Sequence, residues 1–456
     1  MLKIRLIQLL ALVTLLMPLA TSAPALAQDA PTATDTSQDG DAVDESKLTD
    51  AQKANVAVLD EMLRVIRSGF YDKKYGGHDL VEMRARYLRR VVDANPGVDL
   101  HGVLKQLLAE FKVSHLTIIE EEAYRDHFAP EMDNSKVSQA GCDLTELEPG
   151  QYFVSGILQG SAAEKAGLLR GDRVVEVNGK PIAECGLLVD AGGDPGLPGV
   201  PHWFFRNPPE GEFVLKVQRK AESSELIELR FKPSSINMIA ATRNSVTVIE
   251  HEGRKFGYIR FWHFLHDGMT AALRKALRGE FRDCDGLIID LRGRGGSPMV
   301  MNACFAPFAD PPPMRGFGMG GGNFNMPKWT RPVVALQDGG SRSAKEVYAH
   351  NWKHKEVGPL VGESTPGAVL GSTFVQLPDG SWLLYPAQNA SGLAYGNAQL
   401  EGNPVTPTHP VKDLLPYSEG VDTIKDAGIK VLYDLVKELP KVEPHKEKSE
   451  EKEEEF

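Results

Sequence analysis

The sequence has little cysteine and no excess of positive charge. Four of its 456 residues are cysteines, and none has the CxxC spacing typical of zinc or redox sites: Cys142, Cys185, Cys284 and Cys304. The formal net charge is −11, and no basic cluster compensates for it locally. Nucleic acids and anionic membrane surfaces both attract a basic face, so the sequence argues against either partner.

Motifs for metal and nucleotide chemistry are also missing. His350 and His354 have the i, i+4 spacing of a zinc-binding helix but lack the glutamate of HExxH, so we interpret them as helix-surface residues. The glycine-rich segment RGRGGS at 292–297 lacks the GxxxxGK[ST] spacing of a phosphate-binding loop, and no ribose-binding pattern follows it. The sequence therefore predicts no metal site and no nucleotide cofactor.

Beyond the N-terminal end, no stretch is apolar enough to span a bilayer. Lys3 and Arg5 precede an uncharged, mostly apolar stretch over residues 6–20, and Ala25-Leu26-Ala27 follows as a small-x-small cleavage site. This pattern predicts a signal peptide over residues 1–27. The stretch is short for a span of ~20 residues, and membrane association is expected only if it stays uncleaved. We therefore expect an exported protein, either periplasmic or secreted.

Export would permit disulfides, within the pairs Cys142/Cys185 and Cys284/Cys304. The sequence does not determine the pairing, and free buried thiols are the alternative for the second pair.

Changes in composition divide the chain, whose length suggests two or three domains. An acidic, polar segment precedes three helical patterns, a stretch of β-like composition and an α/β pattern, and a charge run ends the chain. The divisions are a disordered linker (28–47), an N-terminal helical domain (48–135), a β-rich module (136–232), an α/β domain (233–439) and a disordered tail (440–456).

Continuous apolar runs define the α/β domain. Residues 286–291 and 332–337 are typical of strands buried on both faces of a parallel sheet, and a glycine-rich turn follows each of them. Functional residues of such sheets gather at the carboxyl ends of the strands, so a site is expected in these turns.

Ser343 follows the second of these runs, after Gly339 and Gly340, and opens a helical pattern. A serine at a strand-turn-helix junction can act as a nucleophile, and the free N–H groups of the helix N-terminus can stabilise an oxyanion. Serine is also a favoured N-cap residue, and Ser341 is an equally plausible nucleophile, so the local sequence leaves these alternatives open.

A base and an acid for such a nucleophile lie far away in the chain. Ser114-His115 follows the three helical patterns, and Glu401 lies in the segment LEGNPVTP. A hydroxyl, an imidazole and a carboxylate are the minimum set for a charge-assisted nucleophile. Each also has a structural alternative, as a surface hydroxyl, an ordinary histidine near a strand or a loop carboxylate.

Several segments together resemble the superfamily of tail-specific, C-terminal-processing and tricorn-core serine peptidases. They are FKVSHLTI, GSAAEKAGLLRGDRVVEVNGKPI, FGYIRFWHF, GLIIDLRGRGG, PVVALQDGGSRSAKE, VGPLVGESTPGAV, LPDGSWLLYP and LEGNPVTP. Their order matches that of the family, and the match covers most of residues 50–438. The resemblance implies a multidomain α/β protein with an N-terminal helical bundle, a PDZ-like β module at 136–232 and an α/β, crotonase-like peptidase core.

The resemblance also implies the site residues. The branch with a Ser/Lys dyad would have its lysine at Ala368, so the chain is more similar to the tricorn-like branch with a Ser-His-Ser-Glu set. That set falls on Ser343 as the nucleophile, His115 as the base, and Ser114 and Glu401 as the groups that hold and polarise the imidazole. The implied oxyanion donors are backbone N–H groups at Gly295, Gly296 and Ala344.

The resemblance implies an exported serine endopeptidase that cleaves unfolded or C-terminally recognised polypeptides through an acyl-enzyme and needs no cofactor. The PDZ-like module would add a substrate C-terminus to a sheet edge as a strand, or act only as a spacer or gate. Loop 309–327 would be a lid over the cleft or a flexible insertion. The alternative function is a catalytically inactive peptide- or ligand-binding protein on the same scaffold, and a third is a PDZ-type scaffold that only tethers partners.

Overall fold

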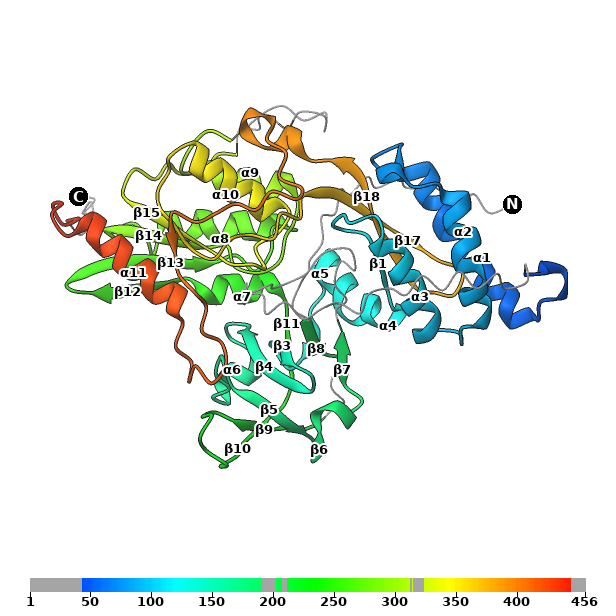
Figure 1. Ribbon diagram of the computed structural model, residues 1–456. Coiled ribbons are helices and arrows are strands. Elements are labelled where there is room, and N and C mark those ends of the chain that lie inside the picture. Colours follow the sequence, from blue (N-terminus) through cyan, green and yellow to red (C-terminus); the bar gives the residue numbers. More distant parts are fainter. Residues whose placement is uncertain (1–42, 191–201, 207–210, 312–313, 315–323, 444–456) are drawn as a thin grey trace, which may run out of the picture.

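The computed structural model describes residues 43–190, 202–206, 211–311, 314 and 324–443 (Figure 1). The expected signal peptide, most of the predicted linker, most of loop 309–327 and the end of the predicted tail lie outside these residues. Among the described residues, no helix combines the length and the apolar character needed to cross a membrane. All four cysteines are free, so neither of the disulfides that export would permit is formed.

The three helical patterns of the N-terminal domain form three helices. They are α1 (Asp50–Gly69), α2 (Leu80–Asp93) and α3 (Val98–Ala109), and the short strand β1 (Thr117–Ile119) follows them. The hydroxyl of Thr49 caps α1 by accepting the N–H of Gln52. Leu59, Met62 and Ile66 recur at helical spacing and are fully buried in the core of this domain.

Short elements connect the larger ones. The short helices are η1 (Glu45–Lys47), η2 (Tyr75–Gly77), α4 (Glu121–Ala123), the π-helical turn η3 (Tyr124–Phe128), α5 (Ala129–Asp133), η4 (Ile182–Glu184), η5 (Ser391–Leu393) and η6 (Tyr395–Asn397). Strands β2 (Val137–Gln139) and β11 (Ser234–Ile236) pair with each other where the chain enters and leaves the β-rich module.

A hairpin from the predicted α/β domain packs on the helical domain. Its strands are β17 (Leu370–Gln376) and β18 (Trp382–Asn389), which run from the core toward the helices in Figure 1. Strand β18 pairs with β1, and Leu377 and Leu383 are buried in the same core as helices α1 to α3. Because the predicted serine–histidine pair shortly precedes β1, this pairing positions it relative to the α/β core.

His101 fastens α3 to this hairpin. Its Nδ1 lies 2.6 Å from Glu120 Oε1, and its Nε2 lies 2.7 Å from Asp379 Oδ2. Burial opposes the charge on the imidazole, but the two carboxylates outweigh burial and raise the pKa of His101 to about 9. The stability gained from this contact is fully present below the unfolded-state pKa of 6.5 and is lost as the pH rises through about 9.

We therefore expect the free energy of unfolding to fall by roughly 2 kcal/mol between about pH 6.5 and about pH 9.5. His101→Gln should be less stable than the wild type at the lower pH. Its free energy of unfolding should decrease much less than that of the wild type between the two pH values. Urea unfolding at both pH values measures the difference. His409→Gln, at an exposed position, is the control and should behave as the wild type. If the free energy of unfolding of His101→Gln decreases as much as that of the wild type, this histidine contributes nothing to the pH dependence.

In its described residues, the β-rich module is an eight-stranded antiparallel sheet with one short α-helix in addition to η4. The strands are β3 (Cys142–Glu148), β4 (Gln151–Ile157), β5 (Arg173–Val177), β6 (Lys180–Pro181), β7 (Leu188–Asp190), β8 (His202–Phe205), β9 (Phe213–Gln218) and β10 (Ile227–Phe231), and the helix is α6 (Ala162–Lys165). The order β10-β9-β5-β4-β3-β8-β7 leaves β10 and β7 as the outer strands, and β6 pairs only with β5. The turn Asn178-Gly179 between β5 and β6 has positive φ at both residues, 50° and 77°, as a tight hairpin turn requires.

The α/β core is built on a six-stranded sheet in the order β12-β13-β14-β15-β16-β19. The strands are β12 (Thr247–His251), β13 (Arg254–Arg260), β14 (Gly286–Asp290), β15 (Val333–Gln337), β16 (Leu360–Gly362) and β19 (His409–Pro410). Only the pairing of β12 with β13 is antiparallel within this described sheet.

Helices cover both faces of this sheet, as the apolar runs predict. One face is covered by α7 (Met238–Ser245), α8 (Asp267–Arg278), α9 (Pro298–Phe305) and α10 (Ala344–His354), and the other by α11 (Thr423–Val436). Along β14, Leu287 and Ile289 face the first group while Ile288 packs with α11. Helix α7 was not predicted from the sequence. The turns after β14 and β15 meet at the same edge of the sheet, because the two strands are parallel neighbours.

Candidate active site

Ser343 stands at the junction between β15 and α10 that the sequence predicts. Its backbone has φ 56° and ψ −121°, a conformation that residues other than glycine rarely adopt. Its N–H donates to Ala368 O (3.0 Å) and to Glu346 Oε2 (3.1 Å), and these contacts hold the turn in place. Strain of this kind at a strand-to-helix turn is typical of a serine that is presented as a nucleophile.

The hydroxyl of Ser341, in contrast, is engaged within the turn. Its Oγ lies 3.1 Å from Leu291 O and 3.0 Å from Asp338 Oδ1, and it accepts the N–H of Asp338 at 3.0 Å. A hydroxyl that is occupied as donor and acceptor inside the protein is poorly placed to attack a substrate. The geometry therefore favours Ser343 over Ser341 as the nucleophile.

The structure brings Ser114, His115 and Glu401 into one hydrogen-bonded chain. Ser114 Oγ lies 2.7 Å from His115 Nδ1 and 2.8 Å from Glu401 Oε2. Because the carboxylate accepts the hydroxyl hydrogen, the imidazole must donate its Nδ1–H to Ser114 Oγ. Glu401 also accepts the backbone N–H groups of Ser114 and Val369, each at 2.7 Å. This chain selects the tautomer of His115 in which Nε2 carries a lone pair.

The Nε2 atom of His115 is buried and has no hydrogen-bond partner in the structure. The residue itself is completely buried and has φ 58°, a second strained position at the site. Burial, followed by the nearby Arg342 guanidinium, holds the pKa of His115 well below its ordinary value of 6.5. The imidazole is therefore neutral, and its lone pair is free to accept a proton.

Ser343 is connected to the hydrogen bonds of Ser114, His115 and Glu401 through backbone atoms and not through its hydroxyl. Its N–H donates to Ala368 O, and the next residue, Val369, donates its own N–H to the carboxylate of the chain. On the other side, Arg342 Nη2 lies 3.4 Å from His115 Nδ1. Since His115 Nε2 has no partner, the hydrogen bond expected between His115 and Ser343 is not formed. In enzymes without substrate, such bonds are often long and tighten only in the substrate complex.

The glycine loop that follows β14 lies against Ser343. A Cβ on Gly295 would come within 3.0 Å of Ser343 Cβ and 3.7 Å of Ser343 Oγ, so a side chain there would crowd the nucleophile. Gly296 has φ 152°, and a Cβ on it would meet the backbone of Phe264 at 2.5 Å. Ala344 is the first residue of α10, where backbone N–H groups have no partner within the helix. Gly295 and Ala344 thus lie next to Ser343, while Gly296 lies against the backbone of Phe264.

Two buried charged residues that the sequence analysis missed stabilise this region. Lys345 is completely buried, and its Nζ lies 2.6 Å from Phe261 O and 2.5 Å from Gly293 O, at the start of the glycine loop. Glu346 is also completely buried and accepts the backbone N–H groups of residues 367–368. Charged residues in a helix ordinarily face solvent, so the sequence carries no signal that would have identified them.

Arg294 joins the glycine loop to the other two domains. Its guanidinium is buried and lies 2.9 Å from Asp143 Oδ1 in β3 and 3.2 Å from Glu131 Oε1 in α5. Burial, opposed by the arginine, raises the pKa of Glu131 to about 7. The position of the loop therefore depends on contacts between all three domains, which no single segment of the sequence reveals.

Both histidines of α10 contact Tyr395, in a nearby segment of the same polypeptide. His350 is half-buried, and its Nε2 lies 3.1 Å from Tyr395 O, while the ring of His354 stacks on the ring of Tyr395. Throughout the described ranges, no group of three or more histidine, cysteine, aspartate or glutamate side chains is arranged to hold a metal ion.

Three protein families match successive parts of the chain. The Tricorn protease C1 domain matches residues 55–109, the PDZ domain matches residues 153–187, and peptidase family S41 matches residues 255–411. These matches fall in turn on the helical region, the β-rich module and the α/β core. The expected fold class, a helical N-terminal region followed by a PDZ domain and an α/β peptidase core, is confirmed.

Individual proteins show the same similarity. The chain is 24% identical to the Tricorn protease of Thermoplasma volcanium over 411 residues, which cover 84% of this chain and 37% of that protein. It is also 24% identical to the chloroplastic C-terminal processing peptidase of Tetradesmus obliquus over 349 residues, or 70% of each chain. The fold is similar to that of a putative S41 protease from Bacteroides fragilis, with a TM-score of 0.53 and 16% identity over 82% of this chain and 97% of the other. The chain thus spans little more than a third of the length of the tricorn relative.

Proposed function

Because the chain belongs to peptidase family S41, we propose that it is a serine endopeptidase that cleaves polypeptides through an acyl-enzyme. The proposal rests on the hydrogen bonds that connect Glu401 to Ser114 and Ser114 to His115. They leave Nε2 of the neutral His115 imidazole without a partner. A buried polar atom without a partner costs about 1–3 kcal/mol, so this one calls for a functional explanation. A general base that awaits the proton of a nucleophile supplies that explanation.

In the proposed reaction, Ser343 Oγ attacks the peptide carbonyl while His115 Nε2 takes the hydroxyl proton. The resulting imidazolium is stabilised through Ser114 by the carboxylate of Glu401. Backbone N–H groups of the glycine loop and of Ala344 stabilise the oxyanion. The imidazolium then protonates the leaving amine, and water hydrolyses the acyl-enzyme with the same residues reversing their roles.

Both reacting side chains are almost completely buried, with exposed fractions of 1% for Ser343 and 0% for His115. A substrate can reach them only when part of the surrounding chain moves. The hydrogen bond between the two side chains would form during this step.

The pH dependence of the reaction tests the base. His115 must be neutral to act, and burial and then Arg342 hold its pKa well below 6.5. We expect kcat/KM to keep its plateau value down to about pH 6.5 and to fall only in more acidic solution. Arg342→Gln should move this acid limb to higher pH, since it removes a nearby positive charge. Burial raises the pKa of Glu346 to about 7, so this carboxyl could also titrate in the same pH range. Glu346→Gln is therefore the control, and its kcat/KM should fall at the same acidic pH as that of the wild type. A wild-type midpoint at or above pH 6.5 would contradict the assignment.

We further propose that the PDZ domain selects polypeptide substrates by their C-termini. PDZ domains bind a peptide as an added strand at a sheet edge. In this sheet the second edge of β3 is occupied by β8, with Asp143 opposite Phe204, and the outer strands are β7 and β10. A substrate would add to one of these outer strands or displace the β7 and β8 pair. Peptides that differ only in a free or an amidated C-terminus should then differ in KM, and equal values would refute this part.

The proposed location is outside the cytoplasm. The support is the charged, apolar and small-residue pattern of residues 1–27, which lie outside the described part of the chain. The mature protein should begin at Gln28, which mass spectrometry of the protein from its native host can establish.

Reaction with a serine-directed fluorophosphonate tests the proposed activity directly. The reagent bonds covalently to a serine that a base activates, so one adduct on Ser343 is expected, located by mass spectrometry of the digested protein. An adduct on a different serine would reassign the nucleophile. A folded protein that remains unlabelled would indicate a binding protein on this scaffold instead of an enzyme.

A further inference from the structure

Lys345 is completely buried between the end of β13 and the glycine loop, and its Nζ lies close to four backbone carbonyl oxygens. The distances are 2.6 Å to Phe261 O, 3.4 Å to Trp262 O, 3.2 Å to Arg292 O and 2.5 Å to Gly293 O. A charged donor binds carbonyl oxygens more strongly than a neutral one does, so this side chain fixes the backbone around it.

The two carbonyls of the glycine loop that bind Lys345 lie at its strained part. Gly293 has φ 67° and Arg294 has φ 48°, a left-handed conformation that residues other than glycine rarely adopt. The peptide group between residues 292 and 293 is held at both ends, since its carbonyl lies near Lys345 and its N–H donates to Asp338 Oδ1 at 3.0 Å. Among the described side chains, only Lys345 donates to a carbonyl of residues 292–296. The conformation of the loop therefore depends on this lysine.

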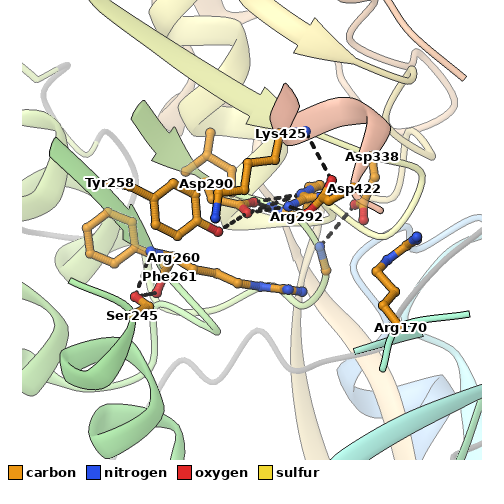
Figure 2. A network of polar contacts seen from close by, with 12 residues as sticks. Arg170, Ser245, Tyr258, Arg260, Phe261, Asp290, Arg292, Asp338, Asp422 and Lys425 are labelled. Carbon is orange, nitrogen blue, oxygen red and sulfur yellow. Dashed lines mark hydrogen bonds and ion pairs between the residues drawn. The ribbon is translucent and has the colours of Figure 1, made fainter. Parts of the chain in front are cut away.

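The side chains of the loop have different partners. Figure 2 shows Arg292 between Asp290 and Asp422, and its guanidinium forms ion pairs with both at 2.7 Å. The guanidinium of Arg294 forms ion pairs with the helical and PDZ domains. These ion pairs attach the loop to its surroundings, whereas Lys345 sets the direction of its peptide groups.

Two N–H groups farther along the loop are not used inside the protein. Within the described part of the chain, neither Gly295 nor Gly296 donates its N–H to another group. The carbonyl of Gly295 accepts the N–H of Phe264 at 2.9 Å. Because the C=O and N–H of a trans peptide point in opposite directions, the N–H of Gly296 points away from Phe264. Unused N–H groups in a loop that lies against Ser343 fit the predicted oxyanion donors.

We propose that Lys345 is a positioning residue for the oxyanion donors of this loop. It lies two residues after Ser343, in the first turn of α10, so the helix that carries the nucleophile also carries the group that orients the loop. The lysine holds the N–H groups of the loop where negative charge develops on the substrate carbonyl in the transition state. It acts through the loop and not on the substrate itself, and this role rests on the proposed peptidase function.

Lys345→Met tests the proposal, because methionine keeps most of the length of lysine but cannot donate to the carbonyls. The kcat for a reduced, alkylated protein substrate should fall by about 10²-fold or more, which is the loss on removing one oxyanion donor, while KM changes little. A peptide boronate forms a tetrahedral adduct with a catalytic serine, so its affinity should fall by a similar factor. A merely structural role would lower the amount of folded protein and leave kcat per folded molecule unchanged.

Lys353→Met is the matched control. Lys353 is an exposed lysine of the same helix, and its Nζ donates to Thr406. This variant should keep the kcat and the boronate affinity of the wild type.

The pH profile of the wild type gives a second measurement, which needs no variant. Burial, and then Arg260, holds the pKa of Lys345 well below its ordinary value of 10.5. The other charged and titratable groups that interact with its charge are Asp290, Asp338, Arg294, Glu131 and His263. A neutral amine has only two hydrogens and a lone pair, so it cannot hold the same carbonyls. In the pH range where circular dichroism shows a folded protein, kcat should decrease in alkaline solution with a midpoint below pH 10.5 and with KM constant. Lys345→Gln should lack this decrease.

The outcomes separate this inference from the proposed function. An active wild type together with wild-type kcat in folded Lys345→Met, or a loss confined to KM, would overturn the inference alone. If neither variant folds, the wild-type profile decides, and a kcat without an alkaline decrease would overturn it. A wild type that neither cleaves the substrate nor reacts with a fluorophosphonate would refute the proposed function and this inference with it.

Discussion

Ser343→Ala is expected to abolish cleavage of an unfolded protein while the fold stays intact. Without the hydroxyl no acyl-enzyme can form, and the loss of a catalytic serine in a well-studied peptidase lowers kcat by roughly 10⁶-fold. The backbone contacts of the turn, from the N–H of Ser343 to Ala368 and Glu346, do not involve the hydroxyl. Stability should therefore change by no more than about 1 kcal/mol. Initial rates on a reduced, alkylated protein substrate and the thermal midpoint measure the two effects.

Ser341→Ala is the informative comparison for this variant. Its hydroxyl contacts Leu291 and Asp338 inside the turn, so its removal should lower the free energy of unfolding by about 1–2 kcal/mol. The variant should still react with a fluorophosphonate and still cleave the substrate. The reverse pattern, with cleavage lost in folded Ser341→Ala and kept in Ser343→Ala, would move the nucleophile to the other serine.

His115→Gln is expected to have the second largest effect, a loss of about 10⁴-fold or more in kcat with little change in KM. Glutamine is close in size to histidine, and its amide can still donate to Ser114 Oγ, but it cannot accept the proton of the nucleophile at neutral pH. Glu401→Gln should cost less than the loss of the base, because the carboxylate only stabilises the imidazolium. Comparing kcat and KM for the two variants separates the base from the group that supports it.

His354→Gln is the matched control for the base, since His354 is exposed and stacks on Tyr395 away from Ser114 and Glu401. It should retain wild-type kcat. If His115→Gln and Ser343→Ala both hydrolyse the substrate at the wild-type rate, the peptidase assignment is wrong. Loss of kcat in His354→Gln comparable to that in His115→Gln would point to general sensitivity of the fold rather than to a base.

The glycine loop illustrates why some site residues were predicted from family resemblance and others were missed. Gly295 and Gly296 follow an apolar run that reads as a buried strand, and the structure places that loop against Ser343. Lys345 and Arg294, which fasten the same loop, were missed. A charged residue has the same local pattern whether it faces solvent or a buried carbonyl, so its burial depends on segments distant in the chain.

The sequence by itself determined those helices and strands that depend on interactions between residues close together in the sequence. Apolar residues at helical spacing and a capping threonine specify α1, and a continuous apolar run specifies β14 with both of its faces buried. Only the tertiary structure decided that Glu401 lies within hydrogen-bond distance of Ser114, 287 positions away, and that β18 pairs with β1. The physical reason is that capping and periodicity act over a few residues, whereas the meeting of distant side chains depends on the packing of whole domains.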